Sequence, residues 1–249
     1  MSLDYLASLQ SDAGRLSDAL ATNPDGAIPW CGTWTVKDCA QHVGGVYHVV
    51  SQVIAGRPSV TFAAYNDLNP PAATDPSLGD WVREGAAAVV EQLAKADPAE
   101  ACWSWSRPDQ HAGFWRRRMA QESVIHRWDS ERAAGRPIGP IDPELAADGI
   151  DEFLGVFVPM TRNVKKAPGG GESVHLHCTD TAGEWLVAFP GEATQDLRRE
   201  HAKGDVAFRG PAEGLLLFLW GRLPAAAAGV EVVGDQAIAD RWRELAPPI

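Results

Sequence analysis

Glu122 and His126 stand four residues apart in a segment with the pattern of a helix, and this spacing can do metal chemistry. Side chains one turn apart leave the same helix face and can close on one ion. Two histidines and one carboxylate are a known zinc set that leaves a coordination position for water or substrate. The same spacing is also typical of a helical ion pair, so the pattern predicts a metal site only with a third ligand.

His42 is the preferred third ligand. It lies midway along a predicted helix, one position off the apolar stripe, where a bundle would direct it toward a neighbouring helix. Asp38 and Cys39 on the same helix are weaker candidates. His175 and His177 alternate on a predicted strand and share a face, which also suits a metal. The sequence offers no third partner near these two, so we expect a satisfied surface pair there.

Two arginines have types and positions that suit anion binding. Arg118 lies one turn before Glu122 on the same face and is a candidate to bind a carboxylate of a bound small molecule; the alternative is a solvated basic turn. Arg222 follows the apolar run 215–220, where its charge would complement a helix C-terminus or hold an anion. The anion-binding expectation rests in both cases on the guanidinium group, whose forked N–H donors match the two oxygens of a carboxylate.

Asp129 follows His126 by three residues. Carboxylates commonly hydrogen-bond the second nitrogen of a metal-bound histidine, and Asp129 is placed to do so. The alternative is a solvated salt bridge with Arg132.

Apolar residues recur with helical period in the segments that must position these groups, 3–20, 36–54, 81–96 and 114–134. Residues 58–79 are rich in Pro, Ala, Asn and Asp without periodicity. A loop of this length is commonly functional, so it could cover a site. Four helices with one long connection indicate a bundle, which we assign to residues 1–140.

The pattern changes after residue 140. A helix is predicted from Asp142-Pro143 to about residue 161, followed by a Gly- and Pro-rich break. Strands are expected at 173–180, 184–189, 205–209 and 230–233, and helices at 213–222 and 236–245. The fold class is therefore mixed, α plus α/β: a four-helix bundle followed by a smaller α+β domain over residues 141–249.

Composition excludes several function classes. The chain has 249 residues, 45% of them hydrophobic, and a formal charge of -11, which repels nucleic acid phosphates. No apolar run reaches the length of a membrane span, and the first residues lack the basic region of a signal peptide, so we expect a cytoplasmic protein. The four scattered cysteines indicate reduced thiols. We expect small-molecule partners and a monomer or homodimer.

A resemblance strengthens the metal hypothesis. Residues 34–42, Trp-Thr-Val-Lys-Asp-Cys-Ala-Gln-His, resemble the W-T-V-x-D-x-x-x-H segment of the mycothiol-dependent maleylpyruvate isomerase family. Residues 118–129 are similar to the second motif of that family, and residues 219–222 with 233–235 to its C-terminal signature. The resemblance implies a DinB-like bundle, and the C-terminal domain resembles sterol-carrier-like domains.

The same resemblance implies which residues bind the metal. Matching the motifs residue by residue gives His42, Glu122 and His126 as ligands of zinc or another divalent metal. Gln121 departs from the pattern, because many relatives carry a histidine there. The difference leaves the three ligands intact and changes a residue next to one of them.

The resemblance also implies a mycothiol cosubstrate and an isomerase activity. A metal-bound thiol loses its proton near neutral pH and becomes a nucleophile. For maleylpyruvate this implies thiolate addition to the cis double bond, rotation and elimination to fumarylpyruvate, with Arg222 holding a carboxylate. The alternatives are a mycothiol S-transferase for electrophiles and a non-catalytic binder of a small apolar ligand. An open coordination position facing a cleft favours an enzyme, and a closed site with an apolar tunnel favours a carrier.

Overall fold

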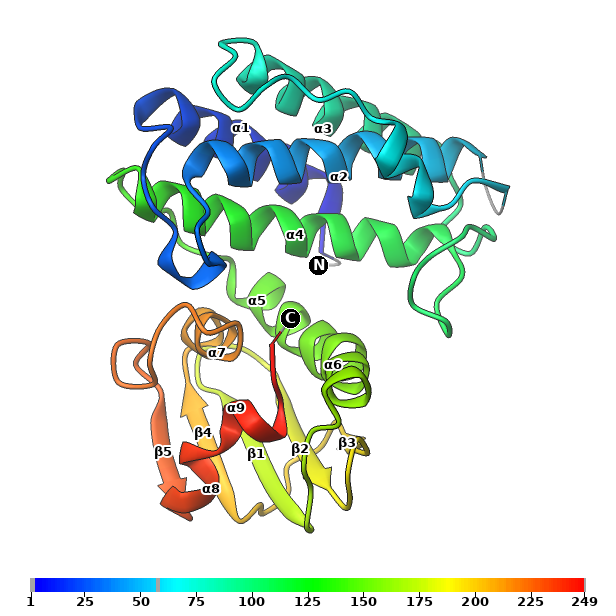
Figure 1. The fold of residues 1–249 in the computed structure, drawn as a ribbon. Coiled ribbons are helices and arrows are strands. Elements are labelled where there is room, and N and C mark those ends of the chain that lie inside the picture. The colour runs from blue at the N-terminus through cyan, green and yellow to red at the C-terminus, as the bar shows by residue number, and fades with distance from the viewer. Residues whose placement is uncertain (1–2, 57–58, 249) are drawn as a thin grey trace. The chain divides into compact units, whose positions relative to one another are not determined.

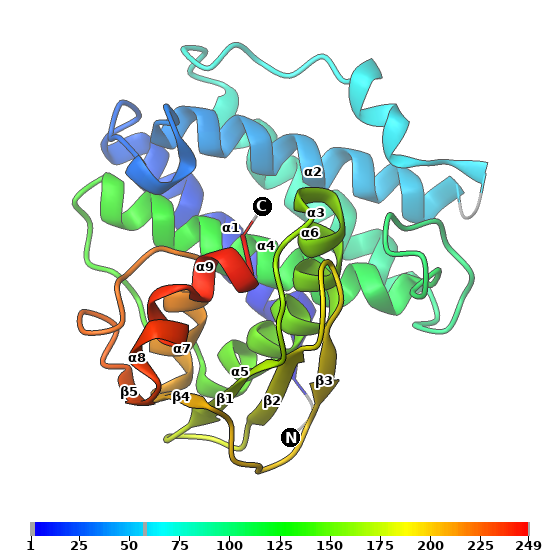
Figure 2. The same ribbon diagram turned by 60° about the horizontal axis from the view of Figure 1, so that its bottom comes forward.

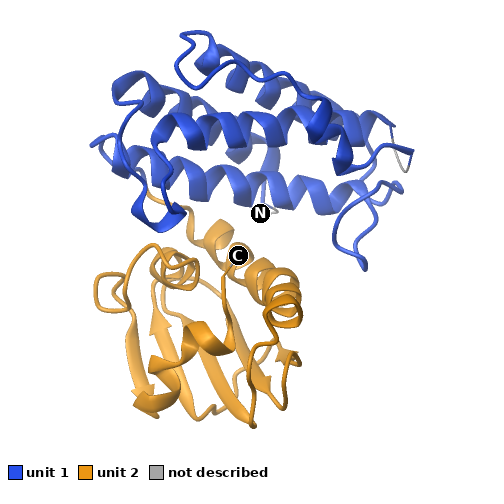
Figure 3. Ribbon diagram, viewed as in Figure 1, with its two compact units in different colours: residues 1–139 blue, residues 140–249 orange. Residues whose placement is uncertain are grey.

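The computed structural model describes residues 3–56 and 59–248. They belong to two compact units: residues 1–139, the helical unit, and residues 140–249, the sheet unit (Figure 3). Pro58, with which the predicted loop 58–79 begins, lies outside the described residues. No helix in the described part of the chain is long and apolar enough to cross a membrane.

Four long helices build the helical unit (Figure 1): α1 (Tyr5–Thr22), α2 (Val36–Gly56), α3 (Leu78–Lys95) and α4 (Ala112–Ala133). Both α1 and α2 pack against α3 and α4. The apolar stripes that predicted these helices are buried, as at Leu16 and Val50, and burying such a side chain contributes roughly 1.5–3 kcal/mol. The predicted bundle is confirmed.

The start of α2 is fixed by a cap. Thr35 donates from both its backbone nitrogen and its hydroxyl to Asp38 Oδ2, at 2.8 and 2.5 Å. These hydrogen bonds are the main reason that the pKa of Asp38 lies below its ordinary value. The carboxylate of Asp38 therefore serves the helix end, which orients the segment that carries His42.

Helix α4 buries charge as well as apolar surface. Arg127 is 2% exposed and binds Asp12 of α1 at 3.0 Å and Glu131 of α4 at 3.1 Å. Buried charges are tolerated only when they are paired, because an unpaired one would cost several kcal/mol. The ion pair to α1 fixes the rotation of α4 about its own axis. That rotation determines the direction in which the other polar side chains of α4 point.

The long connection between α2 and α3 contains a short 3-10 helix, η3 (Phe62–Asp67), whose N-cap is Thr61. Its Tyr65 lies against Gly45 of α2: a Cβ at Gly45 would stand 2.8 Å from the Tyr65 hydroxyl oxygen. A side chain at position 45 would therefore require the Tyr65 ring to move. A second short 3-10 helix, η1 (Pro29–Cys31), precedes α2 and carries Trp30.

The sheet unit begins with α5 (Pro143–Glu152), the π-helical turn η4 (Phe153–Phe157) and α6 (Val158–Lys165). Asp142 caps α5 as predicted. The helical run passes through the π-turn and ends at Lys165, somewhat beyond the predicted end near residue 161. The remaining elements are β1 (Glu172–Cys178), β2 (Glu184–Phe189), β3 (Asp196–Arg198), β4 (Val206–Gly210), α7 (Ala212–Leu219), β5 (Glu231–Gly234), α8 (Gln236–Asp240) and α9 (Trp242–Leu245).

The five strands lie in the order β3-β2-β1-β4-β5, which Figure 2 shows from right to left. β1 and β4 are parallel, and the other neighbours are antiparallel. The sequence did not predict the three-residue β3, and the helix expected at 236–245 is interrupted at Arg241. The predicted α+β class of this unit is confirmed.

One face of the sheet packs against helices. Trp185 donates to Asp151 of α5 at 3.0 Å, and Phe208 contacts Phe218 of α7 and Trp242 of α9. Successive residues of a strand point to opposite faces. The register pairs Leu176 with Trp185 and Phe208, and it pairs the next residue, His177, with Glu184 and Arg209. His177 and Glu184 therefore lie on the face opposite these helices.

Candidate metal centre

Three side chains predicted as ligands come together in the helical unit. His42 comes from α2, Glu122 and His126 come from α4, and the three potential ligand atoms all lie within 4.8 Å of one another. Glu122 Oε1 is 3.0 Å from His42 Nε2 and 3.5 Å from His126 Nε2. Two ligand atoms of a tetrahedral zinc ion with bonds of about 2.0–2.1 Å lie roughly 3.3 Å apart. The three atoms can close on one ion with small movements.

The helices produce this geometry in two ways. The four-residue spacing puts Glu122 and His126 on one face of α4. Packing of α2 against α4 then brings the His42 ring to 5.4 Å from the His126 ring, edge to face. Trp34 covers both rings, at centroid distances of 4.9 Å to His42 and 6.1 Å to His126.

Asp129 fixes the orientation of His126. Its Oδ2 lies 3.1 Å from His126 Nδ1, and its Oδ1 accepts a hydrogen bond of 2.6 Å from Trp30 Nε1. With the Nδ1 proton donated to Asp129, Nε2 is the nitrogen that faces the cluster, and a metal ion bound there would replace the Nε2 proton. The structure thus shows Asp129 behind the histidine. Arg132, its alternative partner, has its guanidinium 5.4 Å from the centre of the Trp128 ring.

Arg118 holds the other oxygen of the carboxylate. Its Nη2 lies 2.8 Å from Glu122 Oε2, and its side chain is 6% exposed, so it is not a solvated basic turn. The two oxygens of Glu122 therefore have different partners: Oε1 faces the histidines and Oε2 faces the guanidinium.

Charge is concentrated at this cluster. Burial alone would raise the pKa of Glu122, but His126, His42 and Arg118 offset it, so the pKa lies well below its ordinary value. Burial would lower the pKa of His126, but Cys39, Glu122 and Asp129 raise it well above the ordinary value. A partly buried carboxylate that stays ionised beside imidazoles is an electrostatic environment that a cation also favours.

A pocket of about 530 Å³ adjoins the cluster. His42 and Trp34 line it from one side, and Tyr65 and Pro70 line it from the long connection. Tyr65 was not identified from the sequence, because nothing in its spacing links it to α2. Only the length of the connection indicated that this segment could cover a site.

The rival ligands on α2 serve other purposes. Cys39 is buried and lies 3.6 Å from Ser130 Oγ and 4.0 Å from the His126 carbonyl oxygen. Asp38 caps its helix, although it also lines the pocket. Neither belongs to the cluster of His42, Glu122 and His126.

Arg222 lies in the sheet unit, in the turn after α7. Its Nη1 donates to the Trp220 carbonyl oxygen at 2.9 Å, and its guanidinium lies 5.9 Å from the centre of the Trp220 ring. Arg222 and the three side chains of the helical cluster therefore belong to different units.

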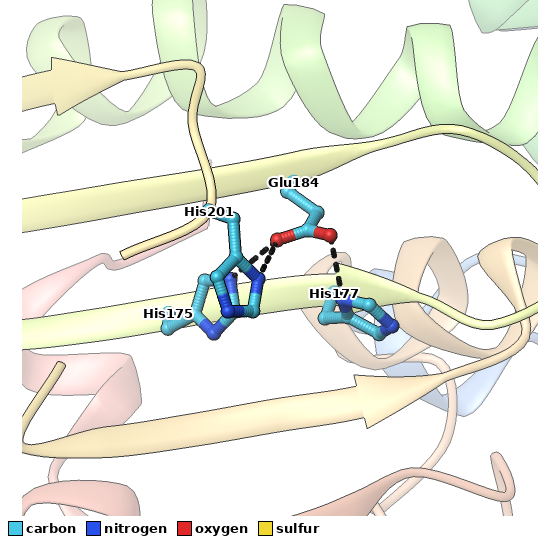
Figure 4. Close-up of side chains that lie close together, drawn as sticks. All are labelled: His175, His177, Glu184 and His201. Carbon is cyan, nitrogen blue, oxygen red and sulfur yellow. Dashed lines mark hydrogen bonds and ion pairs between the residues drawn. The ribbon is translucent and has the colours of Figure 1, made fainter. Parts of the chain in front are cut away.

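The expectation that no third partner lies near His175 and His177 is wrong. Glu184 and His201 join them in a second cluster, whose potential ligand atoms also lie within 4.8 Å of one another (Figure 4). The sequence did not indicate this cluster, because His201 is far along the chain and follows the unpredicted strand β3.

Removing the charge behind His126 should weaken metal binding. In Asp129→Asn the side chain keeps its shape, but the amide can present nitrogen rather than oxygen to Nδ1 and carries no charge to polarise the ring. We expect metal affinity to fall by about 10–100-fold, the usual effect of such partners. Titration with zinc against a chelating indicator measures it.

The control is Asp80→Asn, which changes an exposed carboxylate of α3. Equal zinc affinity in Asp129→Asn and Asp80→Asn would contradict the role of Asp129.

Two family descriptions match the chain. The mycothiol maleylpyruvate isomerase N-terminal domain matches residues 6–131, and the MDMPI C-terminal domain matches residues 144–241. A search of curated proteins gave no match. Among solved structures, the mycothiol-dependent maleylpyruvate isomerase is 15% identical, with 92% of this chain and 91% of that chain covered and a TM-score of 0.62.

A histidine-to-alanine mutant of that isomerase gives 14% identity, the same coverage of 92% and 91%, and a TM-score of 0.62. At this identity the solved structures show a shared fold. The family matches extend further, because together they span most of both units. The chain belongs to the mycothiol maleylpyruvate isomerase family.

Proposed function

We propose that this protein is a metal-dependent isomerase of the maleylpyruvate isomerase type that uses mycothiol as its thiol. The observation that carries the proposal is the cluster of His42, Glu122 and His126 beside a pocket. Two imidazoles and one carboxylate suit zinc and leave a fourth coordination position open. Family membership supports the choice of thiol and reaction.

The donor set fits a divalent metal. Glu122 is ionised, and His126 presents Nε2 because Asp129 engages Nδ1. A metal bound there supplies one chemical property: it lowers the pKa of a bound thiol, so that the thiolate forms near neutral pH. His42 is the ligand that also lines the pocket, so we assign the open position to the pocket side.

Arg118 and Asp129 position the ligands. Arg118 binds Glu122 Oε2 and leaves Oε1 toward the histidines. Arg118 is also our proposed partner for a carboxylate of a small molecule bound near the metal, the substrate, a role to which its planar fork is suited. A bound anion would then share the guanidinium with Glu122.

Two aromatic side chains of the pocket lie near the cluster. Trp34 packs against the histidine rings, and Tyr65 lines the same pocket from the long connection. Burial, together with the charge of Glu122, raises the pKa of Tyr65, so its hydroxyl remains protonated and able to donate a hydrogen bond. We assign Tyr65 to hold an oxygen of the substrate by this donor.

In the proposed reaction the thiolate adds to the cis double bond of the substrate. The new single bond rotates, and elimination of the same thiolate gives the trans isomer, so the thiol is regenerated. Arg222 is proposed to hold a substrate carboxylate, since a guanidinium forks onto both oxygens.

The first test combines metal content with turnover. Elemental analysis of untagged wild type should find zinc, and His42→Ala, Glu122→Ala and His126→Ala should each lose one equivalent per chain. Mycothiol-dependent conversion of maleylpyruvate should fall on the order of 1,000-fold in each, because the metal generates the nucleophile.

The matched control is His48→Gln, which alters another histidine of α2 that binds the Trp81 carbonyl oxygen. Turnover without added thiol, or unchanged zinc in all three variants, would contradict the proposal. Thiol conjugation of electrophiles without isomerisation would identify the protein as a mycothiol S-transferase instead.

Arg222→Lys tests the carboxylate-binding role separately. It keeps the positive charge but loses the forked geometry, so we expect kcat/KM to fall by about 10–100-fold, equivalent to roughly 1.4–2.8 kcal/mol, with zinc content unchanged. Steady-state kinetics with the exposed Arg198→Lys as control measures this. Wild-type kcat/KM in Arg222→Lys would rule out the role.

A further inference from the structure

The second cluster lies in the sheet unit and has no part in the proposed reaction. Figure 4 shows the side chains of His175 and His177 from β1, Glu184 from β2, and His201, which follows β3, turned toward one another. Three imidazoles and one carboxylate are the ligand types that zinc prefers.

The strand register explains how three of these groups meet. His175 and His177 are two residues apart on β1, so they share a face. Glu184 is the direct cross-strand partner of His177 and lies on that same face, opposite the helix-covered side. The chain then brings His201 over this face from the segment after β3.

The distances match those of a coordination shell. Glu184 Oε1 is 3.0 Å from His177 Nδ1, and Glu184 Oε2 is 3.2 Å from His175 Nε2. His201 Nδ1 also contacts Glu184 Oε2. Two ligands of tetrahedral zinc stand roughly 3.3 Å apart, so these separations need little adjustment. Adjacent ring centres lie 5.2–6.3 Å apart.

Charge also favours a cation at this place. Glu184 contributes the one carboxylate of the cluster, and its two oxygens contact all three imidazole rings. Three imidazole nitrogens and one carboxylate oxygen gathered in this way can be shared by a single metal ion.

The basic residue next to His177 in the strand register is paired elsewhere. Arg209 is the β4 neighbour of His177, and its guanidinium lies 3.5 Å from Glu231 of β5. His175 is 8% exposed, and the side chain of His201 is 77% exposed. The cluster thus has a buried base on the sheet and an open side through which an ion can enter.

We propose that His175, His177, Glu184 and His201 bind a second divalent ion of the zinc class. Four protein ligands complete a tetrahedral shell and leave no open position, which is typical of a structural rather than a catalytic site. The ion would connect β1, β2 and the segment after β3 in one unit. It would stabilise that unit through mass action, because the unfolded chain lacks the arranged ligands.

The test uses the full-length, untagged chain and zinc alone. After equilibrium dialysis against zinc, elemental analysis should give two ions per chain in wild type and one in His177→Ala. His126→Ala, which removes a ligand of the helical cluster, should keep one ion, and the double variant His126→Ala/His177→Ala should keep none. Zinc should raise the unfolding temperature of the sheet unit in His126→Ala but not in the double variant.

His201→Ala provides a second variant that does not disturb the core, because its side chain is largely exposed. In the His126→Ala background it should weaken zinc binding by more than about 100-fold, while His48→Gln in that background should not. A His126→Ala chain that binds no zinc, or zinc that persists in the double variant, would overturn this proposal. Failure of the proposed function has a different signature: equal zinc content in wild type and His126→Ala.

Discussion

The helical unit depends on a largely enclosed carboxylate that must remain ionised. The side chain of Glu122 is only 17% exposed, and an unpaired charge in such a position is costly. Arg118 forms an ion pair with one oxygen, and the two histidines approach the other. The negative charge is thereby compensated, while Oε1 still faces the place where a metal ion would bind. A divalent ion would complete the same balance. The rotation of α4 and the start of α2 both serve to bring these groups into contact.

That constraint explains an unusual feature of α4. Most helices of a bundle have one apolar and one polar face, whereas α4 buries polar side chains around much of its circumference. Arg127 and Glu131 bind one another, and Arg127 also binds Asp12 of α1. Asp129 connects the site to Trp30. Helix α4 therefore carries two sets of polar contacts, the ion pairs toward α1 and the site toward α2.

Local pattern accounts for what the sequence predicted. Helical period located the four helices, and the four-residue spacing placed Glu122 and His126 on one face. His42 was the preferred third ligand from its position beside the apolar stripe, and the family resemblance strengthened that choice, because the neighbour of His42 on another helix is set by packing. Tyr65 of the pocket and His201 of the sheet cluster could not be found in this way. Each is positioned by a segment without hydrophobic periodicity, and the segment before His201 contains a strand of only three residues.

The two clusters offer similar ligand types in different settings. The helical cluster has three potential protein ligands beside a pocket, whereas the sheet cluster has four potential ligands, enough for a complete tetrahedral shell. The central claim is that the helical cluster holds an ion with a position open to a thiol. Zinc-edge X-ray absorption of His177→Ala, recorded with and without mycothiol, tests it most directly. The account predicts only nitrogen and oxygen neighbours at first, and one sulfur at about 2.3 Å once the thiol is added. A spectrum that gains no sulfur on addition of mycothiol would contradict it.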